Sequence, residues 1–336
     1  MRKEKNRRFA ILITVMILLL ILLCFFSMNT GFTDLSPSDV LRIFFGHGTP
    51  EETLVLFDFR LVRIVLAMLV GAGLSVSGTV FQTISKNDLA SPDLLGVSAG
   101  AGIAVMLYTF LTPETQRTGI FMLPFVSLLG ALITAFLIYF LAHQKGQAIS
   151  PLRMVLIGIS VTSGINAADM ILAVRLTPEK YHLVNTWMIG SVYGNNWKHV
   201  LALLPWVLVI IPFLIYRSRE LNLLRLSEGV AIGLGSPLKR SRFLFLMLAV
   251  ALAAACVSVG GAIGFVGLIC PHLSRKLVGP NHQYSIPVAA FTGAILLLAA
   301  DWAARMVIAP DEMILGIVVS LIGAPYFLYI LLTSKS

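Results

Sequence analysis

Few side chains in the apolar stretches of this sequence could do chemistry. Asp169 lies inside the apolar run 154–175, where a carboxylate is typical of proton-coupled transporters. Cys270 and His272 flank a proline in "CPH", but one Cys and one His on a helix do not close a metal site, so we interpret His272 as a packed or hydrogen-bonded residue. The three cysteines share no metal-type spacing and imply no disulfide framework. No G-x-x-x-x-G-K-[ST] phosphate loop is present. We therefore predict a chain that is not an enzyme, with no catalytic residue, metal site or cofactor.

The apolar composition predicts the type of secondary structure that holds these residues. Of 336 residues, 57% are hydrophobic and 12% are charged, and the mean hydropathy is +0.90. A soluble domain carries about 25% charged residues. One globule cannot hide so much apolar surface, so lipid is the expected solvent and helices are the expected spanning elements. The formal net charge of +9 fits cationic cytoplasmic loops rather than a nucleic-acid partner.

Ten apolar runs have the length or texture of membrane-spanning helices. The first follows the basic stretch "MRKEKNRR". It is too long for a signal-peptide core and no A-x-A-like cleavage site follows it, so we predict an uncleaved first helix. Gly, Ser and Pro interrupt several other runs, as expected where helices pack closely in a bundle. The runs are 9–28, 62–82, 94–112, 119–142, 154–175, 200–216, 243–260, 262–279, 286–304 and 313–332.

The basic residues orient these runs. With the N-terminus inside and alternating spans, 17 of the 25 Lys and Arg residues fall on the inner side. This bias predicts that both chain ends lie in the cytoplasm. It also places outside a long first loop, 29–61, and the segment "YHLVNTWMIGSVYGNNWKH".

A basic segment, residues 217–242, separates the sixth and seventh runs. Its main part, "RLSEGVAIGLGSPLKRSR" (225–242), is longer than a simple turn needs. The stretch "SEG" favours a helix start and "GSP" a helix stop. From these residues alone two interpretations stay open. The segment is either a plain loop that carries orientation charges, or a pair of short helices on which another protein pushes.

Four blocks in a fixed order resemble the FecCD family, the permease subunits of binding-protein-dependent ABC importers for iron–siderophore complexes and cobalamin. They are "FRLVRIVLAMLVGAGLSVSGTVFQ" (59–82), "NDLASPDLLGVSAGAG" (87–102), "GAIGFVGLICPHLSRKLVGPNHQYSIPVAAFTGAILLLAADWAAR" (261–305) and "DEMILGIVVSLIGAPYFLYILL" (311–332).

The resemblance implies one transmembrane permease domain over residues 1–336, an all-α multi-pass protein with about ten spanning helices and the type II ABC importer permease fold. It also implies a set of partners. Two permease subunits, identical or paralogous, form the pathway in the membrane. Two cytoplasmic ATPase subunits drive transport, and an extracytoplasmic binding protein delivers the ligand.

The resemblance gives roles to three arginines that the predicted topology places outside. Arg60, Arg63 and Arg305 match family positions that pair with glutamates of the binding protein, although Val62 stands where the family has proline. Bidentate Arg–carboxylate pairs suit docking because their geometry is specific. The alternative is that these arginines anchor the helices at the membrane interface.

The resemblance also favours the second interpretation of segment 217–242, as a coupling element that docks on the ATPase. Ser227 replaces the usual glycine there, which affects the detailed turn. The predicted coupling residues are Leu226, Glu228, Gly229, Ala231, Leu234 and Gly235.

The pathway is expected to be wide and weakly charged, so that a bulky ligand passes without being trapped. Small and polar residues in 158–170 suit its lining, and small residues with a proline before and within the eighth run suit close packing or gating. Helix packing alone is an equally valid interpretation of the first set, and it is our interpretation of the second set, with gating by the turn before the eighth run as the alternative. The candidates are Ser160, Thr162, Asn166, Gly264, Gly267 and Pro271.

We therefore expect a cell-membrane permease subunit of an ABC importer that translocates an iron(III)–siderophore complex. Haem and cobalamin are the alternative ligands within the same fold. The mechanistically different alternative is a secondary transporter coupled to protons through Asp169.

Overall fold

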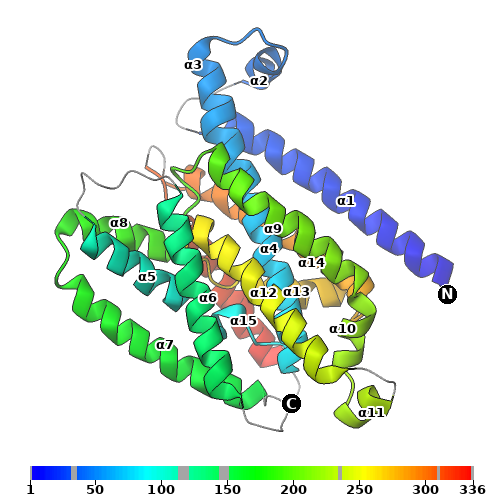
Figure 1. The fold of residues 1–336 in the computed structure, drawn as a ribbon. Helices are drawn as coiled ribbons and strands as arrows, with labels where there is room; N and C mark the ends of the chain where they lie inside the picture. Colours follow the sequence, from blue (N-terminus) through cyan, green and yellow to red (C-terminus); the bar gives the residue numbers. More distant parts are fainter. Residues whose placement is uncertain are drawn as a thin grey trace.

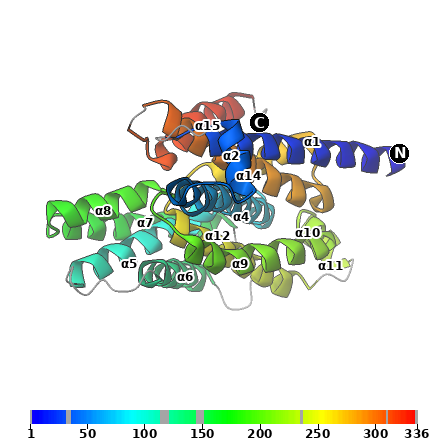
Figure 2. The ribbon, with the colours of Figure 1, turned by 90° about the horizontal axis from the view of Figure 1, so that it is seen from above.

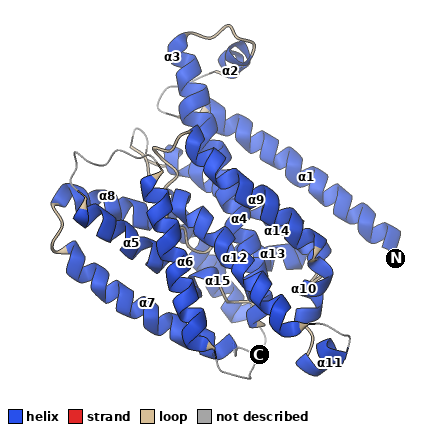
Figure 3. Ribbon diagram, in the orientation of Figure 1, coloured by secondary structure: helices blue, strands red, loops and turns tan. Residues whose placement is uncertain are grey.

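A computed structural model describes residues 2–31, 36–112, 121–143, 151–233, 237–308 and 311–333. Within these ranges the secondary structure is helical and contains no strand (Figure 3). The elements are α1 Arg2–Asn29, α2 Pro37–Phe44, α3 Pro50–Thr53, η1 Leu54–Leu61, α4 Val62–Ser85, η2 Pro92–Leu95, α5 Val97–Leu111, α6 Met122–Ala142, α7 Pro151–Ala173, α8 Pro178–Ile189, α9 Trp197–Tyr216, α10 Ser218–Leu224, α11 Glu228–Gly233, α12 Leu238–Gly260, α13 Val266–Val278, α14 His282–Met306 and α15 Leu315–Thr333.

The helices confirm the predicted all-α multi-pass membrane protein. Eight helical stretches in the described ranges are long and apolar enough to cross a membrane. The other two predicted spans correspond to shorter helices, α5 with 15 residues and α13 with 13. Both are shortened at their N-terminal ends. Gly96, at φ 64°, separates η2 from α5, and Phe265, also at φ 64°, precedes α13.

Helix α4 is the centre of the bundle. It continues η1 without a break and packs against α14, α12, α13 and α9 (Figure 1). Seen from above, α4 and α12 lie between the α14–α15 side and the α5–α6 side (Figure 2). The close approach needs glycine. A Cβ on Gly71 would lie 2.2 Å from the carbonyl oxygen of Gly293, and a Cβ on Gly78 would lie 1.9 Å from that of Gly267.

Helix α1 is the opposite case, because its apolar surface is left for lipid. Only 6% of its most apolar stretch is buried, and it runs along the edge of the bundle beside α14 (Figures 1 and 2). Polar contacts hold it at each end. The hydroxyl of Tyr284 donates to Asn6 Oδ1 at 2.7 Å, and Trp302 Nε1 donates to Thr30 Oγ1 at 2.9 Å.

Contacts at one end of the bundle show that the start of α1 and the end of α15 lie at that same end. The start of α1 meets the start of α14, and the start of α14 is bonded to α10. At the same end, Lys276 of α13 lies over the ring of Tyr329 near the end of α15. The short helices α2 and α3 project from the opposite end (Figure 1). In the predicted orientation the end with α10 is cytoplasmic, and we call it the inner end.

Candidate docking and coupling sites

The three predicted docking arginines meet at the outer end of the bundle. Arg60 lies in η1, a π-helical stretch, Arg63 lies in the first turn of α4, and Arg305 lies in the last turn of α14. All three line one cavity of about 770 Å³, together with Tyr193, Glu312 and neighbouring residues. The wide turn of a π-helix changes the direction in which its side chains point, and such turns are frequent at functional sites.

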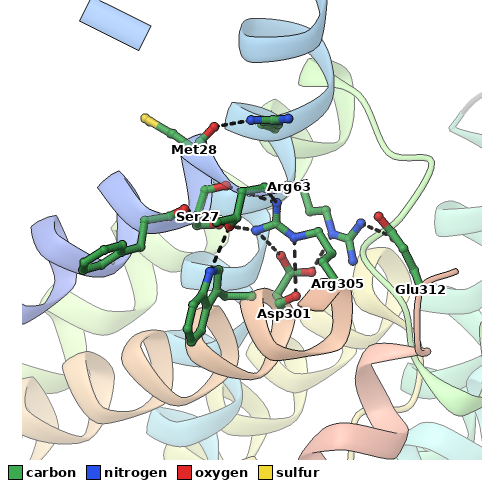
Figure 4. A network of polar contacts seen from close by, with 10 residues as sticks. Ser27, Met28, Arg63, Asp301, Arg305 and Glu312 are labelled. Atoms are coloured by element: carbon green, nitrogen blue, oxygen red, sulfur yellow. Dashed lines mark hydrogen bonds and ion pairs between the residues drawn. The ribbon is translucent and has the colours of Figure 1, made fainter. Parts of the chain in front are cut away.

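Arg305 joins α14 to the end of α1 (Figure 4). Its Nη1 donates to the carbonyl oxygens of Ser27 at 3.1 Å and Thr30 at 2.9 Å, and its Nη2 donates to the hydroxyl of Ser27. Asp301, one turn earlier, lies 3.4 Å from Nη2 and is fully buried. The guanidinium of Arg305 is therefore a structural tie between the two helices, and it is buried rather than presented to solvent.

Arg63 bridges two carboxylates (Figure 4). Its Nε donates to Asp301 Oδ1 at 2.5 Å, and its Nη1 donates to Glu312 Oε2 at 2.6 Å. The guanidinium also lies 5.7 Å from the centre of the Tyr193 ring, within cation–π range. Asp301 is inaccessible, whereas the side chain of Glu312 is 34% exposed, so the Glu312 side of this bridge is the one that a partner can reach.

The arginines were expected to face a partner directly, but Arg60 and Arg305 are buried and the side chain of Arg63 is only 11% exposed. Arg60 is buried and donates to the carbonyl oxygen of Met28. Because Arg60, Arg63 and Arg305 all have partners within the chain, a docking carboxylate would have to enter the outer cavity and compete with an internal acceptor. Among the acceptors that the structure describes, Glu312 is charged and partly exposed, whereas Asp301 is charged and fully buried.

At the inner end, the segment 217–242 contains two short helices, α10 and α11. Hydrogen bonds fasten them to the bundle. Asn222 of α10 donates to Asn281 Oδ1 at 3.1 Å and accepts from the amide of His282 at 3.0 Å. After α10, Lys86 Nζ donates to the carbonyl oxygen of Leu226 at 2.7 Å, and Arg225 donates to that of Pro280 at 3.3 Å. These hydrogen bonds connect the segment to the end of α4 and to the start of α14.

The predicted coupling residues divide into two groups. Leu226 and Gly229 are exposed, as is Val230, which was not predicted, and a Cβ on Gly229 would meet no atom within 4 Å. Ala231 is fully buried, so it packs α11 onto the bundle and does not form part of an exposed face, which corrects our expectation of a docking contact there. Glu228 begins α11. Leu234 and Gly235 lie outside the described residues.

The pathway candidates on α7 lie on two sides of the helix. Ser160 and Asn166 are exposed, whereas Thr162 faces the bundle, with its hydroxyl near Gly96. Asp169 is 6% exposed, and neither of its carboxylate oxygens has a hydrogen-bond partner in the described part of the chain. Helix α7 thus leaves Ser160 and Asn166 exposed among apolar side chains such as Ile159 and Met170, and it encloses the carboxylate of Asp169.

The candidates around α13 also separate. A Cβ on Gly264 would meet nothing within 4 Å, so this glycine has room around it. Pro271 lies inside α13 and has no N–H, which leaves the carbonyl of Gly267 without its usual helical donor. That carbonyl points at Gly78 of α4. Gly267 and Pro271 therefore belong to the packing contact between α4 and α13.

Comparison with known proteins identifies this architecture. The model of the FecCD transport family matches residues 19–333. The chain belongs to the FecCD transport family. It is 44% identical over 337 residues to the iron(3+)-hydroxamate import system permease protein FhuG of Bacillus subtilis. The matched region covers 99% of this chain and all of the relative. It is 39% identical to the cobalamin import system permease protein BtuC of Halobacterium salinarum, over 84% of this chain and 75% of the relative.

A solved structure agrees with the family assignment in three dimensions. A metal-chelate type ABC transporter in an inward-facing conformation superposes with a TM-score of 0.85 at 32% identity, over 96% of this chain and 98% of that one. This FecCD chain is thus a multi-pass membrane permease of the ABC importer class.

Two acidic residues of the outer site were not predicted to take part in it. Asp301 and Glu312 are 238 and 249 positions from Arg63 in sequence. One local signal was available, because Asp301 and Arg305 are four residues apart on a helix and so lie on one face. No comparable spacing points to Glu312, which precedes α15.

Proposed function

We propose that this chain is the permease subunit of an ABC importer that moves an iron(III)–siderophore complex into the cell, driven by ATP hydrolysis in a partner subunit. The observation that carries this proposal is the 44% identity, along the whole of both chains, to an iron(3+)-hydroxamate import permease. A ferric hydroxamate is therefore the first ligand to test. Cobalamin is the second, because a cobalamin import permease is 39% identical.

The outer cavity is the proposed docking point for the binding protein. Three arginines line about 770 Å³ together with the carboxylates of Asp58 and Glu312, so a carboxylate inserted there would compete with an internal one for a guanidinium. Glu312 occupies one side of Arg63 in the free chain. A carboxylate of the binding protein would take the place of Glu312 on Arg63, and the residues before α15 would be released at that moment.

The exposed residues of α11 and of the turn before it are the proposed contact with the ATPase. Leu226 and Val230 are 39% and 53% exposed at the inner end, where water rather than lipid is expected. Small and apolar residues there suit a groove on a soluble partner. The hydrogen bonds from α4 and α14 to this segment provide the route by which ATP-driven movement reaches the bundle.

The polar side of α7 is proposed to line the pathway beside a second permease subunit. Ser160 and Asn166 lie on a surface that the single chain leaves open. Neutral hydroxyl and amide groups give a weakly binding wall, which suits release of the ligand on the inner side.

The test is uptake of labelled ferric hydroxamate, ferric citrate, haem and cobalamin by iron-starved cells that carry the native chain, no chain or Gly229→Trp. A Cβ on Gly229 would meet no atom within 4 Å, so we expect a large side chain there to disturb a partner rather than this chain. We expect one ferric siderophore to lose uptake both without the chain and with Gly229→Trp, at equal protein levels in the membrane.

Asp169→Asn is the companion variant in the same cells. Uptake that survives Gly229→Trp but is lost with Asp169→Asn and with the proton gradient would refute ATP coupling and favour the buried carboxylate of α7 as the coupling group. Uptake of cobalamin alone would refute the iron–siderophore assignment and leave the ABC permease intact.

A further inference from the structure

A second cavity lies at the inner end of the bundle, where α4, α13 and α15 meet the linker that follows α10. Its volume is about 560 Å³. Neither the docking role nor the coupling role described above uses it. The residues around it are Gln82, Thr83, Lys86, Asn87, Asp88, Leu89, Arg225, His272, Arg275, Lys276, Ile330 and Thr333.

The charge around this inner cavity is one-sided. Four cationic side chains line it, from Lys86, Arg225, Arg275 and Lys276, against one carboxylate, that of Asp88. Two of the cations are already bonded to backbone carbonyls, Lys86 to Leu226 and Arg225 to Pro280, which satisfies single donors but neutralises no charge. Excess positive charge around an enclosed space attracts an anion.

Arg275 is the most buried of these four cations, since Lys86, Arg225 and Lys276 are exposed. Its side chain is 11% exposed, and among the described residues it forms an ion pair with Asp88, whose Oδ1 lies 3.2 Å from Nη2. Asp88 itself is 59% exposed, so water weakens that attraction. The same Nη2 atom is buried and makes no hydrogen bond within the described chain. A buried guanidinium normally has its donors satisfied by well-placed acceptors, because an unpaired buried charge is strongly unfavourable.

We propose that the inner cavity binds a phosphate group, held between the guanidinium of Arg275 and the ammonium of Lys276. A phosphate presents several acceptor oxygens, so it can meet the planar fork of Arg275 and a point donor from Lys276 at once. The neutral polar groups of Asn87 and Thr333 also line the space. The inference concerns binding alone and goes beyond the proposed transport function.

A phosphate group bound in this cavity would also contact the residues that hold the linker after α10. Lys86 and Arg225 belong both to this cavity and to the hydrogen bonds that hold the linker after α10. A phosphate group there links the coupling segment to α4 and α13 through shared cations. The shared chemistry has two sources at the inner end, the headgroup of an anionic lipid and dissolved phosphate.

Binding is tested on the purified full-length chain in nanodiscs of phosphatidylcholine. One arm titrates inorganic phosphate against inorganic sulfate and chloride at constant ionic strength and records the thermal unfolding midpoint. The other arm mixes phosphatidylglycerol into the nanodiscs and counts lipids retained in native mass spectrometry. The variants are Arg275→Gln and Lys276→Gln. The matched control is Arg240→Gln, an exposed cation at the inner end that does not line the cavity.

We expect one arm to show binding by the native chain and by Arg240→Gln, with affinity about tenfold or more weaker in Arg275→Gln because a charge-assisted pair of hydrogen bonds is lost. Stabilisation by phosphate identifies the dissolved ion, and retention of phosphatidylglycerol identifies the lipid. Lys276→Gln keeps the test decisive if Arg275→Gln fails to fold, because Lys276 is exposed. The proposal is overturned if neither probe binds, or if the cavity variants bind as the control does.

Discussion

Neutralising Asp301 gives the sharpest test of how the outer site is built. The fully buried carboxylate of Asp301 lies 2.5 Å from Arg63 and 3.4 Å from Arg305, whose side chains are 11% and 4% exposed. Asp301→Asn preserves the shape but leaves two enclosed guanidinium groups with less opposing charge. Removing one partner of a buried ion pair costs about 3–5 kcal/mol.

Glu312→Gln is the matched control, because it removes a carboxylate from the same arginine at a similar distance. The side chain of Glu312 is 34% exposed, so solvent screens the pair with Arg63. An exposed pair contributes about 0–1 kcal/mol. At about 2 °C per kcal/mol for a chain of this size, we expect Asp301→Asn to lower the unfolding midpoint by about 6–10 °C and Glu312→Gln by about 2 °C or less.

The assay is thermal unfolding of the purified chain, followed with a thiol-reactive dye. Cys256 and Cys270 are almost fully buried and become reactive only when the bundle opens. Arg305→Gln should cost less in the Asp301→Asn background than in the native chain, because there it removes an uncompensated cation as well as the hydrogen bonds that tie α14 to α1. Equal midpoints for Asp301→Asn and Glu312→Gln would refute this electrostatic reasoning. So would strictly additive effects of Asp301→Asn and Arg305→Gln on the midpoint.

Two further predictions concern packing and capping. Gly78→Ala should separate α4 from α13, because its Cβ would lie 1.9 Å from the carbonyl oxygen of Gly267. We expect this overpacked contact to destabilise the chain by about 1–3 kcal/mol, whereas Gly264→Ala, with open space around it, should be neutral. The thiol assay compares the two variants, and equal unfolding midpoints would contradict the contact. The hydroxyl and amide of Ser36 donate to Asp39 and lower the pKa of its carboxyl. The stabilisation of α2 from this lowered pKa is present above the ordinary value of about 3.9 and is lost as pH falls through the lower folded value. Hydrogen exchange in α2 should therefore be faster in Ser36→Ala at neutral pH, and unchanged exchange would contradict the capping role.

The sequence was sufficient to predict the spanning helices but not all of their starts. Hydropathy detects apolar length, so the ten runs correspond to helices in the structure. It does not detect a backbone break. The left-handed turn at Gly96 and the loop before Val266 make α5 and α13 start later than the apolar runs predict. The helices of the outer loop were missed, although "SPSD" and "TPEE" carry the residues of two capping boxes.

The members of the outer site were predictable, but their burial was not. Arg60, Arg63 and Arg305 were singled out because cations on the outer side run against the charge bias and match the family pattern. Whether an arginine faces solvent depends on acceptors supplied by other elements. For Arg305 these include the carbonyl oxygens of Ser27 and Thr30, nearly the whole chain away. Patterns along one helix contain no record of such contacts.

The most direct measurement for the central claim is ATP-dependent uptake of a ferric hydroxamate by proteoliposomes. They would contain this chain with the subunits that copurify from iron-starved cells, and the binding protein would be added outside. The account predicts uptake that requires ATP at the ATPase face, survives collapse of the proton gradient and is lost with Gly229→Trp. Uptake without ATP, or uptake that stops when the proton gradient is collapsed, would contradict it.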